Sequence, residues 1–416
     1  MATMINTIIY AYLNQRIIGI LLFLRRTFME KEKLWTKDFI NITIISFFIF
    51  LVFYVLIASL PLYLVENLNA GADKAGLLTT LFLAAAIVIR PLAGKWVEKG
   101  SQKKILIYST IAFCIASSLY LFTKSLGAIL VLRIFHGLTF GIITTVKGTI
   151  SAELIPASRR GEGVSYFSLA MGVAMVFGPV IGLNLANHNM YTLSIILCII
   201  FAAINILLAL VINVPKLEPV TKIEKRGFSW NDIMDGKTIP YAIPTFLLAT
   251  SYSCVSAFLA IYAKELNLVA AASTFFIVYA IFMIIFRPFT GKYSDMYGPK
   301  IIVIPCILIF AIGMFILQLP LTGFLMIIAG ILIGIGYGSV TPVFQSQIIS
   351  SVERHRVGIA NSVFFNAMDL GMAVGSFILG IVASNAGYSR MYLVAMGIII
   401  VTFFIYIGIT KEKRRQ

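Results

Sequence analysis

Charged residues are scarce in this sequence, because Asp, Glu, Lys and Arg together make up only 12% of its 416 residues. A soluble domain usually has about a quarter of its residues charged, so the composition excludes a soluble globular enzyme. A disordered chain is excluded as well, since 60% of the residues are hydrophobic. The composition therefore indicates an integral membrane protein made of helices.

Cysteine is rare, and basic residues outnumber acidic ones. Cys114, Cys198, Cys254 and Cys306 all fall in apolar stretches and lack the CxxC spacing of a metal site, so we interpret them as packing residues. The sequence has 17 Asp and Glu against 33 Lys and Arg. Basic cytoplasmic loops explain such an excess in a membrane protein, and we expect neither a nucleic-acid partner nor a metal site.

Motifs of membrane-bound enzymes and of ATP-driven pumps are missing from the sequence. It contains no HExxH, no GxSxG and no GxxxxGK[ST]. The glycines between Gly334 and Gly338 lie inside an apolar run, which excludes a phosphate-binding loop. We therefore expect no enzymatic activity, no catalytic residues and no cofactor.

Apolar runs dominate the chain instead. A membrane span needs roughly 20 apolar residues, and the runs predict an all-α integral membrane fold with twelve spans. The predicted spans cover residues 39–63, 75–95, 104–122, 126–151, 162–186, 190–213, 239–263, 271–291, 300–317, 320–348, 357–384 and 388–410. The predicted domains are an N-terminal extension at 1–38, cytoplasmic or surface-lying, six-helix bundles at 39–214 and 239–410, a cytoplasmic linker at 215–238 and a cytoplasmic tail at 411–416.

Basic residues also predict the orientation. With twelve spans both termini lie on one side, and that side carries basic clusters such as those in 95–104 and 411–415. The opposite loops hold only Lys74, Lys124, Lys264 and Arg390. The positive-inside rule then places both termini in the cytoplasm of a multi-pass cell-membrane protein, which we expect to be a bacterial plasma-membrane protein. Residues 1–28 are expected to form a surface-lying helix, or to precede the natural start at Met29.

The two halves resemble each other when one is shifted by 197 residues. Arg90-Pro91 then falls on Arg287-Pro288, and Glu98 falls on Asp295. Several glycines coincide as well: Gly94 with Gly291, Gly137 with Gly334, Gly141 with Gly338, Gly161 with Gly358 and Gly178 with Gly375. Internal duplication of this kind is typical of secondary transporters that bind a substrate between two pseudo-symmetric halves.

Three motifs carry a resemblance to a known family. Residues 94–104 resemble the major facilitator superfamily signature between spans 2 and 3, and residues 133–141 resemble its Arg-containing motif in span 4. In span 5, residues 172–182 are similar to the antiporter signature of twelve-span drug/proton antiporters. The resemblance implies two pseudo-symmetric six-helix bundles and export of a small molecule in exchange for protons.

Span 4 holds the most informative polar side chains. Arg133, His136, Phe140, Thr144 and Lys147 fall within roughly 80° of one another on a helix. A stripe with two cations cannot face lipid, so we expect it to face a water-filled cavity or a partner. Arg133 is either a proton-coupling or substrate-orienting cation or a structural donor to backbone carbonyls. Lys147 either joins the site or snorkels to the interface, and His136 either carries protons or is only a hydrogen-bonded cavity residue.

Span 11 contains Asp369, the only acid deep inside a predicted span. Its predicted face also carries Ser362, Asn366 and Ser376, so we expect Asp369 to point into the cavity. Span 1 has no acid in its middle, only Asp38 at its edge, so proton coupling rests on Asp369 or His136. Asp369 is a proton carrier, an anchor for a cationic substrate, or a carboxylate tied down inside the bundle.

Glu98 and Asp295 occupy corresponding cytoplasmic loops and are predicted to cap the N-termini of neighbouring helices. By the family resemblance, the helix next to Glu98 is span 11, which begins near Val357. We expect these caps to form a latch between the halves, although a solvated loop charge is the alternative for Glu98. The predicted cytoplasmic gate contains Gly94, Glu98, Lys99, Glu153, Arg159, Gly291 and Asp295.

The glycines of span 5 predict close helix packing. Gly172, Gly178 and Gly182 leave room for a neighbouring backbone, and Pro179 bends the helix. We expect this segment to seal two spans from opposite halves against each other.

The sequence as a whole predicts a secondary transporter that exports a small amphipathic molecule, multidrug-type, in exchange for protons by alternating access. The alternative is a dedicated exporter of an anionic or zwitterionic metabolite with the same fold. The expected partners are the small-molecule substrate, protons and the lipid bilayer, and we expect a monomer.

Overall fold

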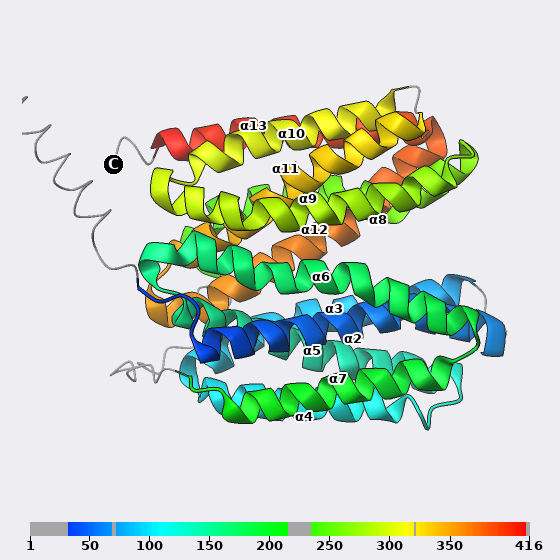
Figure 1. Cartoon of the computed structure of the whole chain (residues 1–416), viewed down its shortest axis with the longest axis vertical. Helices are drawn as coiled ribbons and strands as arrows, with labels where there is room; N and C mark the ends of the chain where they lie inside the picture. The colour runs from blue at the N-terminus through cyan, green and yellow to red at the C-terminus, as the bar shows by residue number, and fades with distance from the viewer. Residues whose placement is uncertain (1–31, 69–71, 215–233, 320–321, 413–416) are drawn as a thin grey trace, which may run out of the picture. The chain divides into compact units, whose positions relative to one another are not determined.

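The computed structural model describes residues 32–68, 72–214, 234–319 and 322–412, and these fold into long helices (Figure 1). The twelve long helices are α2 (Lys37–Leu68), α3 (Ala72–Lys99), α4 (Gln102–Leu119), α5 (Leu126–Leu154), α6 (Arg160–Asn187), α7 (Tyr191–Val211), α8 (Ile239–Glu265), α9 (Val269–Tyr297), α10 (Lys300–Gln318), α11 (Gly323–Ser350), α12 (Val357–Ala386) and α13 (Tyr388–Glu412). Single 3₁₀ turns, η1 (Ala157–Arg159), η3 (Gly236–Thr238) and η4 (Arg354–Arg356), precede α6, α8 and α12. The predicted extension and linker lie mostly outside the described residues.

The apolar runs become helices because a spanning segment must satisfy its own backbone hydrogen bonds. Among the described residues, eleven helices are long and apolar enough to cross a membrane; α4, with 18 residues, is the twelfth helix of the set. Capping residues mark where helices begin and end. Ser125 Oγ accepts a hydrogen bond from Ala128 N at the start of α5, and Gly298, with φ 90°, ends α9. The predicted all-α membrane fold is confirmed.

The described residues from Leu34 onward form one compact unit, in which the helices gather into two bundles (Figure 1). The first bundle, α2–α7, lies below the second bundle, α8–α13, in this view. Between the bundles α3 packs on α12 and α6 packs on α9. The 197-residue shift maps 72–99 onto 269–296 and 160–187 onto 357–384, so the two contacts are related by the internal repeat.

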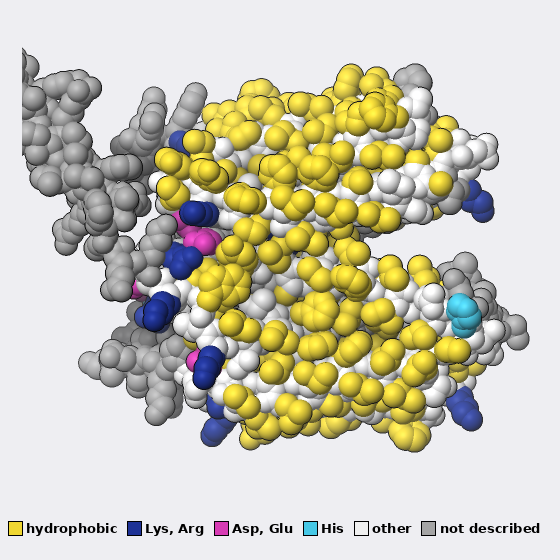
Figure 2. Space-filling model, in the orientation of Figure 1, with side chains coloured by type: hydrophobic (Ala, Val, Ile, Leu, Met, Phe, Trp, Pro, Cys, Tyr) yellow, Lys and Arg dark blue, Asp and Glu magenta, His cyan; other side chains and the backbone are white. Residues whose placement is uncertain are grey.

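The two ends of the unit differ. The first described helix begins, and the last ends, at the left of Figure 1; we call this the terminal end. Figure 2 shows basic and acidic side chains gathered at the terminal end, a broad hydrophobic band along the helices, and a cleft between the bundles at the opposite end. In α12 every residue from Val357 to Phe365 is buried, whereas Leu370, Ala373 and Val374 are exposed. The bundles therefore pack together at the terminal end and separate toward the other.

Candidate functional site

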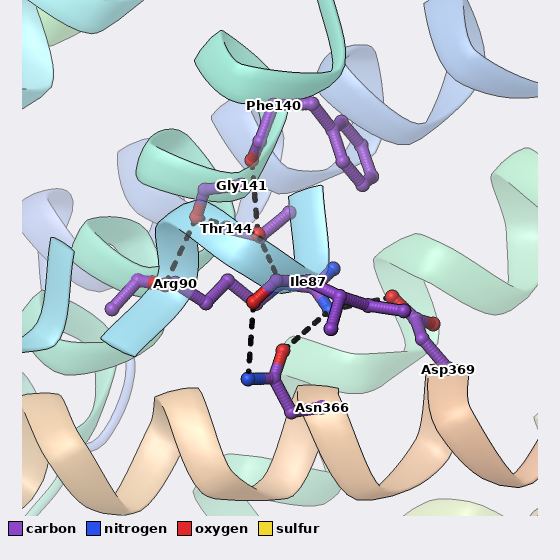
Figure 3. A network of polar contacts seen from close by, with 8 residues as sticks. Ile87, Arg90, Phe140, Gly141, Thr144, Asn366 and Asp369 are labelled. Atoms are coloured by element: carbon purple, nitrogen blue, oxygen red, sulfur yellow. Dashed lines mark hydrogen bonds and ion pairs between the residues drawn. The ribbon is translucent and has the colours of Figure 1, made fainter. Parts of the chain in front are cut away.

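An ion pair joins the two bundles inside the hydrophobic region (Figure 3). Arg90 on α3 donates from Nη1 to Oδ2 of Asp369 on α12, at 2.5 Å. The Arg90 side chain is 2% exposed, whereas the Asp369 side chain is 22% exposed. Asp369 therefore has a charged partner from the other bundle, and its own side chain remains partly exposed.

Further hydrogen bonds hold this pair in place (Figure 3). Arg90 Nε donates to Thr144 Oγ1 at 3.4 Å, and its Nη1 also lies 3.4 Å from Asn366 Oδ1. Asn366 Nδ2 in turn donates to the carbonyl oxygen of Ile87 at 3.3 Å. The ring of Phe365 lies 5.3 Å from the Arg90 guanidinium carbon, within the range of a cation–π contact. Asp369 and Asn366 were predicted site residues, Thr144 belongs to the stripe on α5, and Arg90 is the residue that brings the three together.

Arg287 is the repeat equivalent of Arg90, and it also crosses between the bundles. It is 3% exposed on α9, donates from Nε to Gly338 O at 2.8 Å, and donates from Nη1 to Ser168 O of α6 at 2.5 Å. Arg90 and Arg287 entered the sequence analysis only as landmarks of the repeat. That repeat is the signal that could have identified them, because an arginine kept in the middle of both halves requires a buried partner.

Arg133 and His136 lie inside the first bundle, away from Asp369. Arg133 Nη2 donates to Leu56 O at 3.2 Å, as the structural alternative expected. His136 is fully buried and packs against the Phe113 ring, with a centroid distance of 4.3 Å; its Nδ1 lies 3.4 Å from Tyr120 Oη. The stripe residues share one side of α5, but Arg133 and His136 at one end of the stripe contact other residues than Lys147 does at the other end.

Lys147, at the other end of that stripe, lines a cavity between the bundles. It is fully buried; its Nζ donates to Ser46 Oγ at 2.5 Å and lies 4.1 Å from the Phe50 ring centroid. It therefore does not snorkel to the interface. The cavity has a volume of about 20 Å³, enough for about one water molecule. Its lining is Ser46, Phe50, Lys147, Phe167, Ser168, Met171, Arg287, Thr341, Pro342, Gln345, Phe364 and Phe365.

Both predicted caps are present at the terminal end. Asp295 accepts hydrogen bonds from the backbone N–H groups of Gly161 and Glu162, at 2.7 and 2.8 Å, at the start of α6. Glu98 Oε1 accepts from Ile359 N at 3.4 Å, at the start of α12. Each carboxylate therefore caps a helix of the opposite bundle, where free N–H groups and the helix dipole favour an anion.

The other predicted gate residues surround these caps. A Cβ built on Gly94 would lie 3.2 Å from Gly358 O, so Gly94 permits the close approach of α3 to α12. Arg159 pairs with Glu162 at 2.8 Å. Glu153 instead bonds Gln102 within the first bundle, at 2.6 Å.

Gly291 and Lys99 complete the predicted gate. A Cβ on Gly291 would meet Gly161 O, so Gly291 brings α9 close to α6. The Lys99 side chain is exposed at the end of α3.

The glycines of α6 do not all perform the predicted seal. Gly172 faces α9 of the other bundle, where a Cβ would meet Met283. Gly178 and Gly182 instead face α2 of their own bundle, where a Cβ would meet Tyr54 or Val55. The expected seal between halves is therefore wrong for Gly178 and Gly182, because these positions lie roughly 80–120° around the helix from Gly172 and face α2 instead. Pro179 lies inside the same helix.

Comparisons with known proteins agree with this architecture. The sequence matches the Major Facilitator Superfamily in two overlapping stretches, residues 42–268 and 241–416. It is 26% identical to the staphylopine export protein of Staphylococcus aureus over 81% of this chain and 87% of that protein. It is 21% identical to the multidrug resistance protein MdtG of Enterobacter lignolyticus over 85% of this chain and 87% of that protein. The crystal structure of the transporter FucP in the outward conformation superimposes with a TM-score of 0.74, covering 90% of this chain and 99% of that one at 14% identity.

Proposed function

Because the chain belongs to the major facilitator superfamily, we propose that it is a proton-driven exporter of small amphipathic molecules that works by alternating access. Two relatives support export, since one is named for the export of staphylopine and the other for multidrug resistance. The proposed location is the cell membrane, with both termini in the cytoplasm and one chain as the working unit. The basic clusters at the terminal end support this orientation.

With this orientation the structure corresponds to an outward-facing state. The caps made by Asp295 and Glu98 hold the bundles together on the cytoplasmic side. The cleft in Figure 2 opens toward the outside. Transport then requires these caps to break, so that the bundles separate on the cytoplasmic side and close outside.

The ion pair between Arg90 and Asp369 is the observation that carries proton coupling. In this state the two charges attract across the bundles at 2.5 Å, and burial strengthens that attraction relative to water. A proton that enters from the cleft and neutralises Asp369 removes the attraction. Protonation therefore favours separation of α3 from α12 and the return to the inward-facing state, as an exporter driven by inward proton flow requires.

The driving force is sufficient for accumulation against a gradient. Moving one charge across a membrane potential of about 100 mV supplies about 2.3 kcal/mol. One proton per cycle can therefore sustain about a 50-fold gradient of an uncharged substrate at that potential.

Everted membrane vesicles provide the test of this function. Everted vesicles are prepared from cells that overproduce the protein, or the purified protein is reconstituted into vesicles. The vesicle interior is acidified, and uptake is followed for a panel of cationic, neutral and anionic amphipathic compounds. We expect uphill uptake of at least one compound, abolished by a protonophore and accompanied by proton efflux from the vesicle. Uptake of every panel member at the rate of protein-free vesicles would contradict the proposal. The same panel separates a multidrug exporter, which transports several unrelated compounds, from a dedicated one.

A further inference from the structure

We propose that Lys147 and Arg287 form an anion-binding subsite, where the carboxylate of an amphipathic substrate binds between the bundles. This inference rests on the proposed function and specifies the substrate class. The two cations lie on different bundles, Lys147 on α5 and Arg287 on α9. Both line the cavity between the bundles that is described above. An anion held by both would therefore contact both moving halves.

Neither cation has an acidic partner in the part of the chain that the structure describes. The contacts of Lys147 are the Ser46 hydroxyl and the rings of Phe50 and Phe167. Arg287 bonds two backbone carbonyl oxygens, those of Gly338 and Ser168. A desolvated cation without a counter-ion is costly, and neutral acceptors compensate that cost only in part. An anionic ligand would supply the missing charge.

The internal repeat shows that Arg287 faces a glycine at the position where its equivalent, Arg90, faces an acid. In one contact between the bundles, Arg90 meets Asp369. In the equivalent contact, Arg287 meets position 172, which the 197-residue shift places opposite 369 and which is a glycine. A Cβ built on Gly172 would lie 3.5 Å from Arg287 Nη1. An acid at this position would reach Arg287, and the sequence omits it.

The remaining lining fits the body of an amphipathic anion. Phe50, Phe167 and Phe364 provide aromatic surface, while Gln345 adds a polar group. The cavity of about 20 Å³ is the contracted, outward-facing form of the subsite. Separation of the bundles on the cytoplasmic side widens it, and a substrate enters from there. Asp369 is an acid that would repel an anion, but its negative charge is balanced by the ion pair with Arg90.

The test uses matched ligands and matched variants. Binding of 4-phenylbutyrate, its uncharged amide and 4-phenylbutylamine to the purified full chain is measured by calorimetry in detergent. The parent should prefer the carboxylate. G172D supplies an internal carboxylate to Arg287, whereas G172N has nearly the same shape without the charge, so both displace the flexible end of Met283 equally.

We expect G172D and Lys147→Gln each to raise the Kd for 4-phenylbutyrate about 10- to 100-fold. Lys147→Gln removes one charge-assisted contact of the ligand, and the carboxylate of G172D competes with the ligand for Arg287. G172N should change this Kd less than about threefold, and the Kd for the amide should stay constant in all variants. Equal carboxylate affinities for G172D and G172N would overturn the subsite, as would a parent that binds the amine or the amide at least as tightly, or binds none of the three. Proton-driven uptake of cationic or neutral compounds in the vesicle assay would leave the proposed function intact in that event.

Discussion

At the scale of the residue, the proposed proton coupling depends on one contact between the bundles, that of Arg90 with Asp369. Either charge alone would be costly in a hydrophobic region, and together they form an ion pair between two helices in which Arg90 is buried and Asp369 is partly exposed. An arginine cannot be deprotonated in a protein, so the proposed coupling assigns the transported proton to the Asp369 carboxylate.

Replacing Asp369 by Asn tests this role. The amide keeps the shape and can still accept a hydrogen bond from Arg90, but it cannot release a proton. We expect uphill export driven by a pH gradient to be lost, while downhill substrate flux remains. Loss of the charged partner should weaken the contact by about 2 kcal/mol, or about 30-fold in the balance of the two states. The measurement is uphill and downhill flux in the same vesicle preparation.

His136→Asn is the control for this prediction, because His136 is fully buried in the first bundle and lies beside Tyr120 rather than Asp369. We expect it to retain uphill export. If Asp369→Asn still drives uphill export and His136→Asn does not, proton coupling belongs to His136.

At the scale of the element, the repeat places the same device at both contacts between the bundles. Asp295 near the end of α9 caps the start of α6, and Glu98 near the end of α3 caps the start of α12. Both caps join a helix of one bundle to a helix of the other. They can therefore exist only while the terminal end is closed.

We predict that Asp295→Asn shifts the protein toward the inward-facing state. Loss of a charged cap costs about 0.5–2 kcal/mol, which changes a two-state equilibrium about 2- to 30-fold. Spin labels at Lys104 of the first bundle and Glu353 of the second, both exposed at the terminal end, should report a larger fraction of long distances. Glu98→Gln should shift the distances in the same direction and slow turnover.

Asp38→Asn provides a matched control. Asp38 accepts a hydrogen bond from Asn213 N at 2.8 Å, a contact between α2 and the segment that follows α7 in the same bundle. Its loss should lower the unfolding temperature without changing the distance distribution. The latch is excluded if Asp38→Asn and Asp295→Asn change the distances equally, or if neither changes them.

At the scale of the whole molecule, the alternation of twelve helices determines which loops share a side. We predict that cysteines introduced at Glu265 and Glu353, both exposed, react with a membrane-impermeant maleimide from opposite sides, with Glu265→Cys labelled from outside in intact cells. The native cysteines Cys198, Cys254 and Cys306 are buried, and Cys114 is partly buried, so the unmodified protein serves as background.

Labelling of both cysteines from the same side would contradict the twelve-span arrangement. Labelling of Glu353→Cys from outside and Glu265→Cys from inside would reverse the orientation. The outward-facing interpretation of the cleft would then be wrong, while the bundle architecture would remain.

The sequence by itself determined the fold class, because hydrophobic length and backbone hydrogen bonding leave a long apolar chain few solutions other than helices. It also predicted the two caps, since the acids lie in corresponding loops of the repeat and the family resemblance implied which helix lies next to Glu98. Asp369 and Asn366 were recognised because a polar side chain deep in an apolar run requires a partner. These inferences depend on local pattern, on the repeat and on the family resemblance.

Only the tertiary structure decided which partner each polar side chain has. Periodicity places Arg133, His136 and Lys147 on one side of α5, but that side meets different neighbours along its length, so His136 is enclosed in its own bundle while Lys147 reaches the cavity between the bundles. Arg90 became the partner of Asp369 because α3 and α12, far apart in sequence, pack against each other. Such pairings depend on how helices rotate and pack, which no single helix encodes.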